Sequence, residues 1–429
     1  MIQAVRLMLA LASIVVRTQE VTLDSLLFTW ARTSLLVDWR QSNCRIEAAG
    51  GLPLLANREE NIVPDVADSL RRLAADPNPD VRLRIAQKLS FFVKFDESFA
   101  WELAERFARK EQQVKVLFFF LNHSVQRWIA WRPARCYELM AILLERLERG
   151  ELASDETRFR EETTDGLQGE MGRILAQAGL WHDHVPAREC LTACLQDLPR
   201  LKPLLMSSIG SVIGVLAQTE PSREGELAAC RQRVIVWLSH LVQQTLTVID
   251  DFEMRFRLGE LNNEEVHPSY QVAVEIANEV ATHVSFRLAW NRENQDTNCV
   301  RADDTARQRF LVEGHDLLAK LVRVHYAPAV RHVIELLRVL LPFNPCQVIE
   351  YAGQLLSPDT DGRLRDYHVY DSLVWGEVRA FARTILAEHP DTLRDLSTGE
   401  SLMRILDIFA KAGWPSALAI MNELETVWR

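Results

Sequence analysis

One short stretch of the sequence has residue types that could bind a metal ion. Trp181-His182-Asp183-His184 places two imidazoles around a carboxylate, and Cys190 and Cys194 follow it. Imidazole and thiolate are ligands that zinc prefers, so the stretch could form a zinc site. The alternative is a polar turn, capped by Asp183, before a helix that begins near Pro186. We favour the turn and predict no bound metal.

A second stretch, residues 127–135, interleaves cations with aromatic rings. Such a pattern could stack bases, grip phosphates or contact another macromolecule. The alternative, which we favour, is two core tryptophans with solvated arginine stems beside them. The candidate partner-contact residues are Arg127, Trp128, Trp131, Arg132 and Arg135.

Motifs of nucleotide and hydrolytic chemistry are missing from the sequence. A phosphate-binding loop needs G-x-x-x-x-G-K-[ST], and no glycine here is followed by lysine. The patterns GxSxG, HExxH and GxGxxG are absent as well. We therefore expect a non-enzymatic protein with no catalytic residues and no cofactor.

Charge and cysteine content narrow the class of protein. Lys and Arg total 49 and Asp and Glu total 59, which gives a net charge of −10. A dedicated nucleic-acid binder usually carries a basic footprint, so nucleic acid is not the favoured partner, although a local basic face could survive. The 7 cysteines are scattered with no CxxC pair, which is typical of reduced thiols in a cytoplasmic protein.

The elements that must position these residues are predicted to be helices. Hydrophobic residues make up 48% of the 429 positions, but Gly (17) and Pro (16) are sparse. Phe99, Leu103 and Phe107 show the typical helical spacing. Many prolines stand just before such apolar runs, where a missing N–H costs little. They are Pro64, Pro133, Pro186, Pro199, Pro221, Pro268, Pro328, Pro345, Pro390 and Pro415.

A helix–turn–helix pattern covers residues 63–89 and turns at Asp76-Pro77-Asn78-Pro79. This segment resembles a HEAT repeat, including the Asp-Pro turn and the Val81-Arg82 pair that opens the second helix. The resemblance implies a ladder of hydrogen bonds between adjacent repeats that uses Asp76 and Arg82. We therefore expect an all-α protein, an α-solenoid of degenerate HEAT-like helical hairpins. The repeat-structural residues are Asp76, Pro77, Val81 and Arg82.

The expected organisation has an N-terminal helical segment at 1–62, the solenoid at 63–429, and an exposed polar loop at 291–304. The closing segment, 402–429, resembles the end of bacterial STAND-type NTPases, whose C-terminal halves are helical repeats. That resemblance implies a sensor in signalling or anti-phage defence. Because the phosphate loop is missing, the NTPase module would be a separate chain or lie upstream.

Three further segments have two interpretations each. Residues 1–16 are apolar, and we favour a buried helix over a signal peptide. Residues 204–217 form an apolar run of 14 residues after Pro203, which is too short to span a membrane. For Gly210 and Gly214 in this run we favour close approach of a neighbouring helix over helix dimerisation in a membrane. The acidic run 151–170 is expected to be a solvated face or loop, with a site for a basic partner as the alternative.

These observations favour a non-enzymatic scaffold or sensor that binds a protein partner in the cytoplasm, without a membrane. The alternative is a HEAT-scaffold protein that binds nucleic acid, as some helical-repeat DNA-repair proteins do. That alternative requires a basic face, which the net charge does not indicate.

Overall fold

The computed structural model describes residues 42–56, 63–94, 96–152, 159, 163–260, 267–289, 302–356 and 371–428. Within these residues the regular structure is helical and contains no strand, which confirms the all-α class. The apolar stretch 1–16, most of the polar loop predicted at 291–304 and the predicted boundary at residue 62 lie outside the described residues, and those predictions stay predictions.

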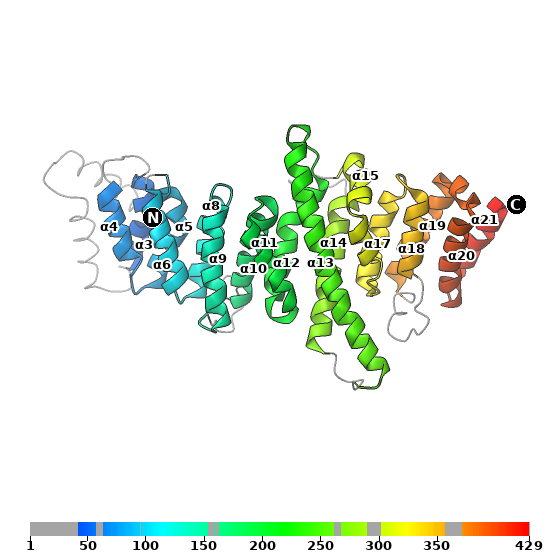
Figure 1. Cartoon of the computed structure of the whole chain (residues 1–429), viewed down its shortest axis with the longest axis horizontal. Coiled ribbons are helices and arrows are strands. Elements are labelled where there is room, and N and C mark those ends of the chain that lie inside the picture. Colours follow the sequence, from blue (N-terminus) through cyan, green and yellow to red (C-terminus); the bar gives the residue numbers. More distant parts are fainter. Residues whose placement is uncertain are drawn as a thin grey trace. The chain divides into compact units, whose positions relative to one another are not determined.

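The chain divides into two compact units, residues 1–178 (unit 1) and 179–429 (unit 2). In unit 1, α3 packs on α5, α5 on α7, and α7 on α10, which gives a first layer of helices. A second layer contains α4, α6 and α9, of which α6 packs on α9. Figure 1 shows these short helices side by side. Their bounds are α3 Ser42–Ala56, α4 Val63–Leu73, α5 Pro79–Phe92, α6 Glu97–Lys110, α7 Val114–Phe120, the π-helix η4 Leu121–Val125, α8 Gln126–Trp128, α9 Pro133–Glu148 and α10 Thr164–Ala176.

Unit 2 also brings together helices that are not consecutive in the chain. α12 packs on α14, α14 on α17, and α17 on α19, while α18 packs on α20. The long helix α13 (Glu224–Arg257, 34 residues) would span about 50 Å, and Figure 1 shows it extending beyond its neighbours in the unit. The other bounds are η6 Gln177–Trp181 (at the boundary), α11 Val185–Ala193, η7 Cys194–Gln196, α12 Leu198–Val212, η8 Ile213–Ala217, η9 Pro221–Arg223, α14 Pro268–Ala289, α15 Asp304–Glu313, α16 His315–Leu321, α17 Ala327–Leu340, α18 Pro345–Leu356, α19 Ser372–Glu388, η11 Pro390–Arg394, α20 Leu396–Lys411 and α21 Pro415–Trp428.

Local signals set many of these helix starts. Every proline that the sequence predicts at a helix start lies in the first two positions of an α- or 3₁₀-helix. Side-chain oxygens cap several helices as well: Asn78 accepts from the amide of Asp80, and Asp96 accepts from the amide of Phe99. These caps satisfy amides that have no partner within their own helix.

The apolar run in unit 2 is longer than the sequence predicts. Pro203 lies inside α12 instead of opening a helix, so the helical stretch Leu198–Ala217 has 20 residues. It is the one described stretch that is long and apolar enough to cross a membrane, and 56% of its most apolar 18-residue window is buried within the protein. The argument that this run is too short to span a membrane is therefore wrong. A Cβ at Gly210 would lie 3.6 Å from the ring of His283 on α14, whereas a Cβ at Gly214 would meet no atom of a neighbour within 4 Å. Of these two glycines, the predicted close approach of a neighbouring helix therefore holds at Gly210 alone.

Candidate partner-binding surface

Arg82 connects two successive turns of unit 1. Its Nη1 donates to the carbonyl oxygens of Asp76 (2.7 Å) and Pro77 (3.1 Å), which belong to the turn before α5. Its Nε and Nη2 bond both carboxylate oxygens of Glu111, at 2.7 and 2.9 Å, in the turn before α7. The hydrogen bonds with Glu111 raise the pKa of Arg82 above its ordinary value. One guanidinium therefore joins one helical hairpin to the next.

The same arrangement occurs one hairpin earlier. Asp76 accepts from the amide of Asn78 in its own turn (2.8 Å) and from Arg45 Nη1 on α3 (2.7 Å). Glu111 likewise accepts from amides in its own turn, at Gln112 (3.0 Å) and Gln113 (2.9 Å). The two partners are 31 residues apart in the first case and 29 in the second. We call the pairs Arg45–Asp76 and Arg82–Glu111 the turn rungs.

Arg146 adds a third connection to these turns from the second layer. Its Nη1 donates to the carbonyl of Ala108 (2.7 Å) and its Nη2 to the carbonyl of Glu111 (2.8 Å), while Nε contacts Glu151 at 3.1 Å. The buried guanidinium thus serves carbonyls at the end of α6 that lack helical partners.

The HEAT-like motif of the sequence covers one half of this arrangement. Val81 is buried in the core, and Pro77 lies exposed in the turn. The motif did not indicate Arg45, Glu111 or Arg146. In the sequence, Glu111 is an acid that directly follows a predicted helix, as Asp76 is, and this position is the signal that could have indicated a second turn. It is a weaker signal because no proline directly follows Glu111.

The two tryptophans of the 127–135 stretch have different environments. Trp128 is buried, with its ring 4.6 Å from that of Trp101. Trp131 is 50% exposed, so the prediction that both tryptophans are core residues is wrong for Trp131. The reason is that α8 ends at Trp128 and a turn follows, closed by the Trp131 amide on the Trp128 carbonyl (3.0 Å).

The arginines of the same stretch also contact different helices. Arg132 bonds Glu97 at 2.6 and 3.1 Å, and Arg135 contacts Glu105 at 3.3 Å, so acids of α6 already hold both. Arg127 points to α5 instead: its Nη1 lies 3.4 Å from Ser90 Oγ, and its guanidinium lies 5.0 Å from the ring centroid of Phe91. The five predicted contact residues therefore do not form one surface.

Arg127 belongs to a different group on the first layer, which we call the basic-aromatic face: Lys88, Phe91, Phe119, His123 and Arg127. The Lys88 ammonium lies 5.5 Å from the ring centroid of Phe91, so two cations approach one ring. The rings of Phe119 and His123 are stacked at 5.6 Å. Burial lowers the pKa of His123, and the charges of Arg127 and Lys88 lower it further.

A π-helix positions this face. The π-helix η4 lies between α7 and α8 and contacts α5. Its buried Ser124 hydroxyl donates to the carbonyl of Ala86 (2.6 Å) and accepts from the amide of Ser90 (3.2 Å), both on α5. These bonds fix η4 against α5. They thereby also position His123 in η4 and Arg127 in α8 beside α5. Short π-helices often occur at functional sites.

The predicted turn at residues 181–184 is present, but Asp183 does not cap the helix. The N-cap of α11 is His184, and Asp183 adopts a left-handed conformation (φ 55°) in which its carboxylate pairs with Arg188 and, at 3.5 Å, with Arg233. Burial lowers the pKa of His182. No group of three or more potential ligands for a metal ion occurs in the described part of the chain.

One acid of the predicted acidic run is buried, and so are two cysteine thiols elsewhere in the chain. Glu170, in the acidic run that the sequence assigns to a solvated face or loop, is buried on α10 and paired with Arg173, so the expectation is wrong at that position. Burial raises the pKa of Cys136 to about 12 and that of Cys230 to about 11. Such burial is typical of structural cysteines rather than of reactive ones.

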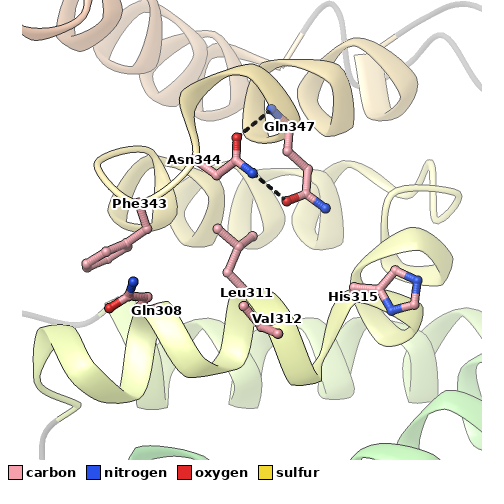
Figure 2. A pocket seen from close by; sticks show the side chains of 7 residues that line it. All are labelled: Gln308, Leu311, Val312, His315, Phe343, Asn344 and Gln347. Carbon is pink, nitrogen blue, oxygen red and sulfur yellow. Dashed lines mark hydrogen bonds between the residues drawn. The ribbon is translucent and has the colours of Figure 1, made fainter.

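A shallow pocket of about 310 Å³ lies in unit 2, between α15, the start of α16 and the turn before α18. Figure 2 shows the amides of Asn344 and Gln347 turned toward each other, with a bond of 3.1 Å between them. Its lining holds one titratable side chain, His315, and offers no paired acid and base for catalysis.

No protein-family model matches this chain, and no curated protein matches it in a sequence comparison.

Proposed function

We propose that this protein is a non-enzymatic helical-repeat scaffold that binds a protein partner. The observation that supports this proposal is the pair of turn rungs. Each rung fixes one hairpin of unit 1 on the next through the same chemistry, as in a HEAT-like solenoid. Stacked hairpins present a continuous row of helices, which is the kind of surface that repeat proteins use for binding.

The packing of alternate helices agrees with this proposal in both units. α5 contacts both α3 and α7 in unit 1, and α17 contacts both α14 and α19 in unit 2. In repeat proteins such nearest-neighbour packing leaves an extended surface along the helix row, and we propose that surface as the binding side. A partner that runs along this side would touch several hairpins at once.

Site-specific photo-crosslinking in the native cells tests the proposal. A photoreactive phenylalanine analogue is placed singly at exposed positions across both layers of unit 1 and across unit 2. We expect neighbouring positions on one surface to crosslink to the same protein, while positions elsewhere do not. Adducts scattered over all faces, or no discrete protein adduct from any position, would contradict the proposal.

The nature of the crosslinked partner tests the defence context. The resemblance of residues 402–429 to STAND-type NTPases leads us to propose a partner that carries a phosphate-binding loop. The expected partner hydrolyses ATP, and its rate changes when this chain is added. A partner without that loop would remove the defence NTPase from the proposal and leave the scaffold.

The residue types of the basic-aromatic face are the observation behind a second candidate function, nucleic-acid binding. Cations beside aromatic rings are also the residue types of single-strand binding surfaces. Retention of the protein on single-stranded DNA at low salt, lost at higher salt, is the result that would support this candidate.

A further inference from the structure

We infer that the basic-aromatic face binds an acidic segment of the protein partner, in which apolar side chains alternate with carboxylates. This inference rests on the proposed scaffold function and assigns the chemistry of its ligand. Four features of the face support this inference: its cations have no acidic partner in the described part of the chain, its rings are partly exposed, its cations are few, and cations surround His123.

Charge distinguishes this face from the second layer of the same unit. There Arg71, Arg132 and Arg135 each pair with an acid of α6, at 2.9, 2.6 and 3.3 Å. Within the described residues, Lys88 and Arg127 have ring contacts instead and no acid at ion-pair distance. The face therefore offers two cations that carboxylates from another molecule can reach.

Apolar rings lie between and beside these cations. Phe91, Phe118 and Phe119 are each partly exposed, and the last two pack edge to face with centroids 5.5 Å apart. Aromatic rings at the centre of an interface provide much of its binding energy when apolar side chains cover them. A ligand that suits both features carries aliphatic or aromatic side chains next to its acids.

The same features favour a peptide over a nucleic acid. Both unpaired cations approach the ring of Phe91, at 5.0 and 5.5 Å, so they compete with a base for its faces. Two cations neutralise few phosphates, whereas nucleic-acid affinity comes largely from many such contacts. The net charge of −10 further opposes a polyanion, but a peptide with a few acids needs only the local charge of the face.

His123 provides an independent readout of the occupant. The charged groups that act on it are Lys88 on α5, Arg127 on α8, and Glu170 and Arg173 on α10, and burial together with the cations lowers its pKa. Carboxylates bound to Lys88 and Arg127 would offset those cations. The pKa of His123 would therefore rise when an acidic peptide binds.

The experiment selects ligands from a library of short random peptides on the full-length protein. The test variant carries Lys88→Gln and Arg127→Gln. The matched control carries Arg109→Gln and Lys110→Gln on α6, which removes the same charge from another surface. Circular dichroism and thermal unfolding establish that both variants fold. Selected peptides and single-stranded oligothymidine are then measured by fluorescence anisotropy.

We expect selected peptides rich in Asp or Glu next to Leu, Phe or Trp. The test variant should bind them about tenfold more weakly, with no change in the control. The pKa of His123, followed by NMR, should rise with the peptide.

Equal binding by the test variant and the parent, selection of peptides without acids, or tighter binding of oligothymidine than of any peptide would overturn the inference. These results leave the scaffold proposal standing if crosslinking finds one partner on another surface. If crosslinking finds no partner while the selected peptides bind as expected, the scaffold proposal fails, but the assignment of acidic peptides to the basic-aromatic face stands.

Discussion

Units 1 and 2 both use arginine to join helices, but the carboxylates that receive it differ. In unit 1, Arg82 meets Glu111, an acid held in a turn by two backbone amides and only 3% exposed. In unit 2, the buried Arg231 of α13 bonds Glu224 (2.6 Å) and Glu313 (3.2 Å), which are 45% and 29% exposed. One Nη of Arg231 has no hydrogen-bond partner.

This difference shows what makes an ion pair repeatable along a chain. An acid in a turn has a fixed position relative to the next helix, so an arginine at the start of the preceding hairpin's helix can reach it in successive hairpins. An acid on a helix face depends on the particular packing of two helices. The Arg231 cluster also includes Arg309, which bonds Glu224 at 3.0 and 3.2 Å, and it links α13 to α15 once.

The largest expected effect is the loss of a turn rung. Arg82→Met keeps the apolar stem but leaves the buried Glu111 without its cation. Removing one partner of a buried ion pair costs about 3 kcal/mol. We expect the free energy of local unfolding to fall by about this amount, measured by hydrogen exchange in peptides from α5 and α6. Exchange in unit 2 serves as the internal control, and a change below about 1 kcal/mol in unit 1 would contradict the account.

A smaller effect is expected for the corresponding change in unit 2. Arg231→Met leaves Glu224 and Glu313 partly solvated, and Arg309 still pairs with Glu224. The expected loss of unfolding free energy is about 1 kcal/mol, since half-exposed acids regain water. Hydrogen exchange in α13 and α15 measures it. A loss as large as that of Arg82→Met would remove the distinction between the two units.

Exposed interhelical pairs should contribute little in either unit. Arg71→Ala breaks a pair with Glu102 in unit 1, and Arg383→Ala breaks a pair with Glu423 in unit 2. Each change is expected to lower the unfolding free energy by no more than about 0.5 kcal/mol. Urea unfolding of both variants tests this, and a clear loss in one unit alone would show that surface pairs matter there.

The smallest effect concerns two histidines and pH. The pKa values of His123 in unit 1 and His182 in unit 2 are both lowered by burial, but cations act on His123 alone. Because the folded state resists protonation, stability is complete above the unfolded pKa of about 6.5 and decreases as pH falls below it.

Arg127→Gln removes one cation near His123 and should raise the pKa of this residue, leaving that of His182 unchanged. NMR titration of both rings checks the prediction. An unchanged pKa for His123 would mean that Arg127 does not lie beside it.

The sequence predicts those features whose cause is local. The prolines that precede apolar runs open helices, whereas Pro53 and Pro203 lie inside α3 and α12. Asp76-Pro77 marks the tight turn before α5. The HEAT-like resemblance of residues 63–89 includes Arg82, whose bond to the Asp76 carbonyl spans 6 residues. These parts of the fold depend on the residues directly beside them.

The remaining features depend on tertiary packing. Glu111 lies 29 residues from Arg82, in a turn without proline, so no local motif marks it. The basic-aromatic face combines residues of α5, α7, η4 and α8, and the π-helix shifts the helical register that a periodic pattern assumes. Trp131 lies three residues after the buried Trp128, as a core residue of a helix would, but α8 ends at Trp128 and the turn that follows exposes Trp131.

A double-mutant cycle tests most directly whether turn rungs hold the hairpins of unit 1 together. Arg82→Met and Glu111→Gln are measured singly and together, beside Arg231→Met and Glu313→Gln. We predict a coupling free energy of about 2 kcal/mol for the turn rung and less than about 1 kcal/mol for the pair in unit 2. Equal couplings, or a larger one in unit 2, would contradict the account.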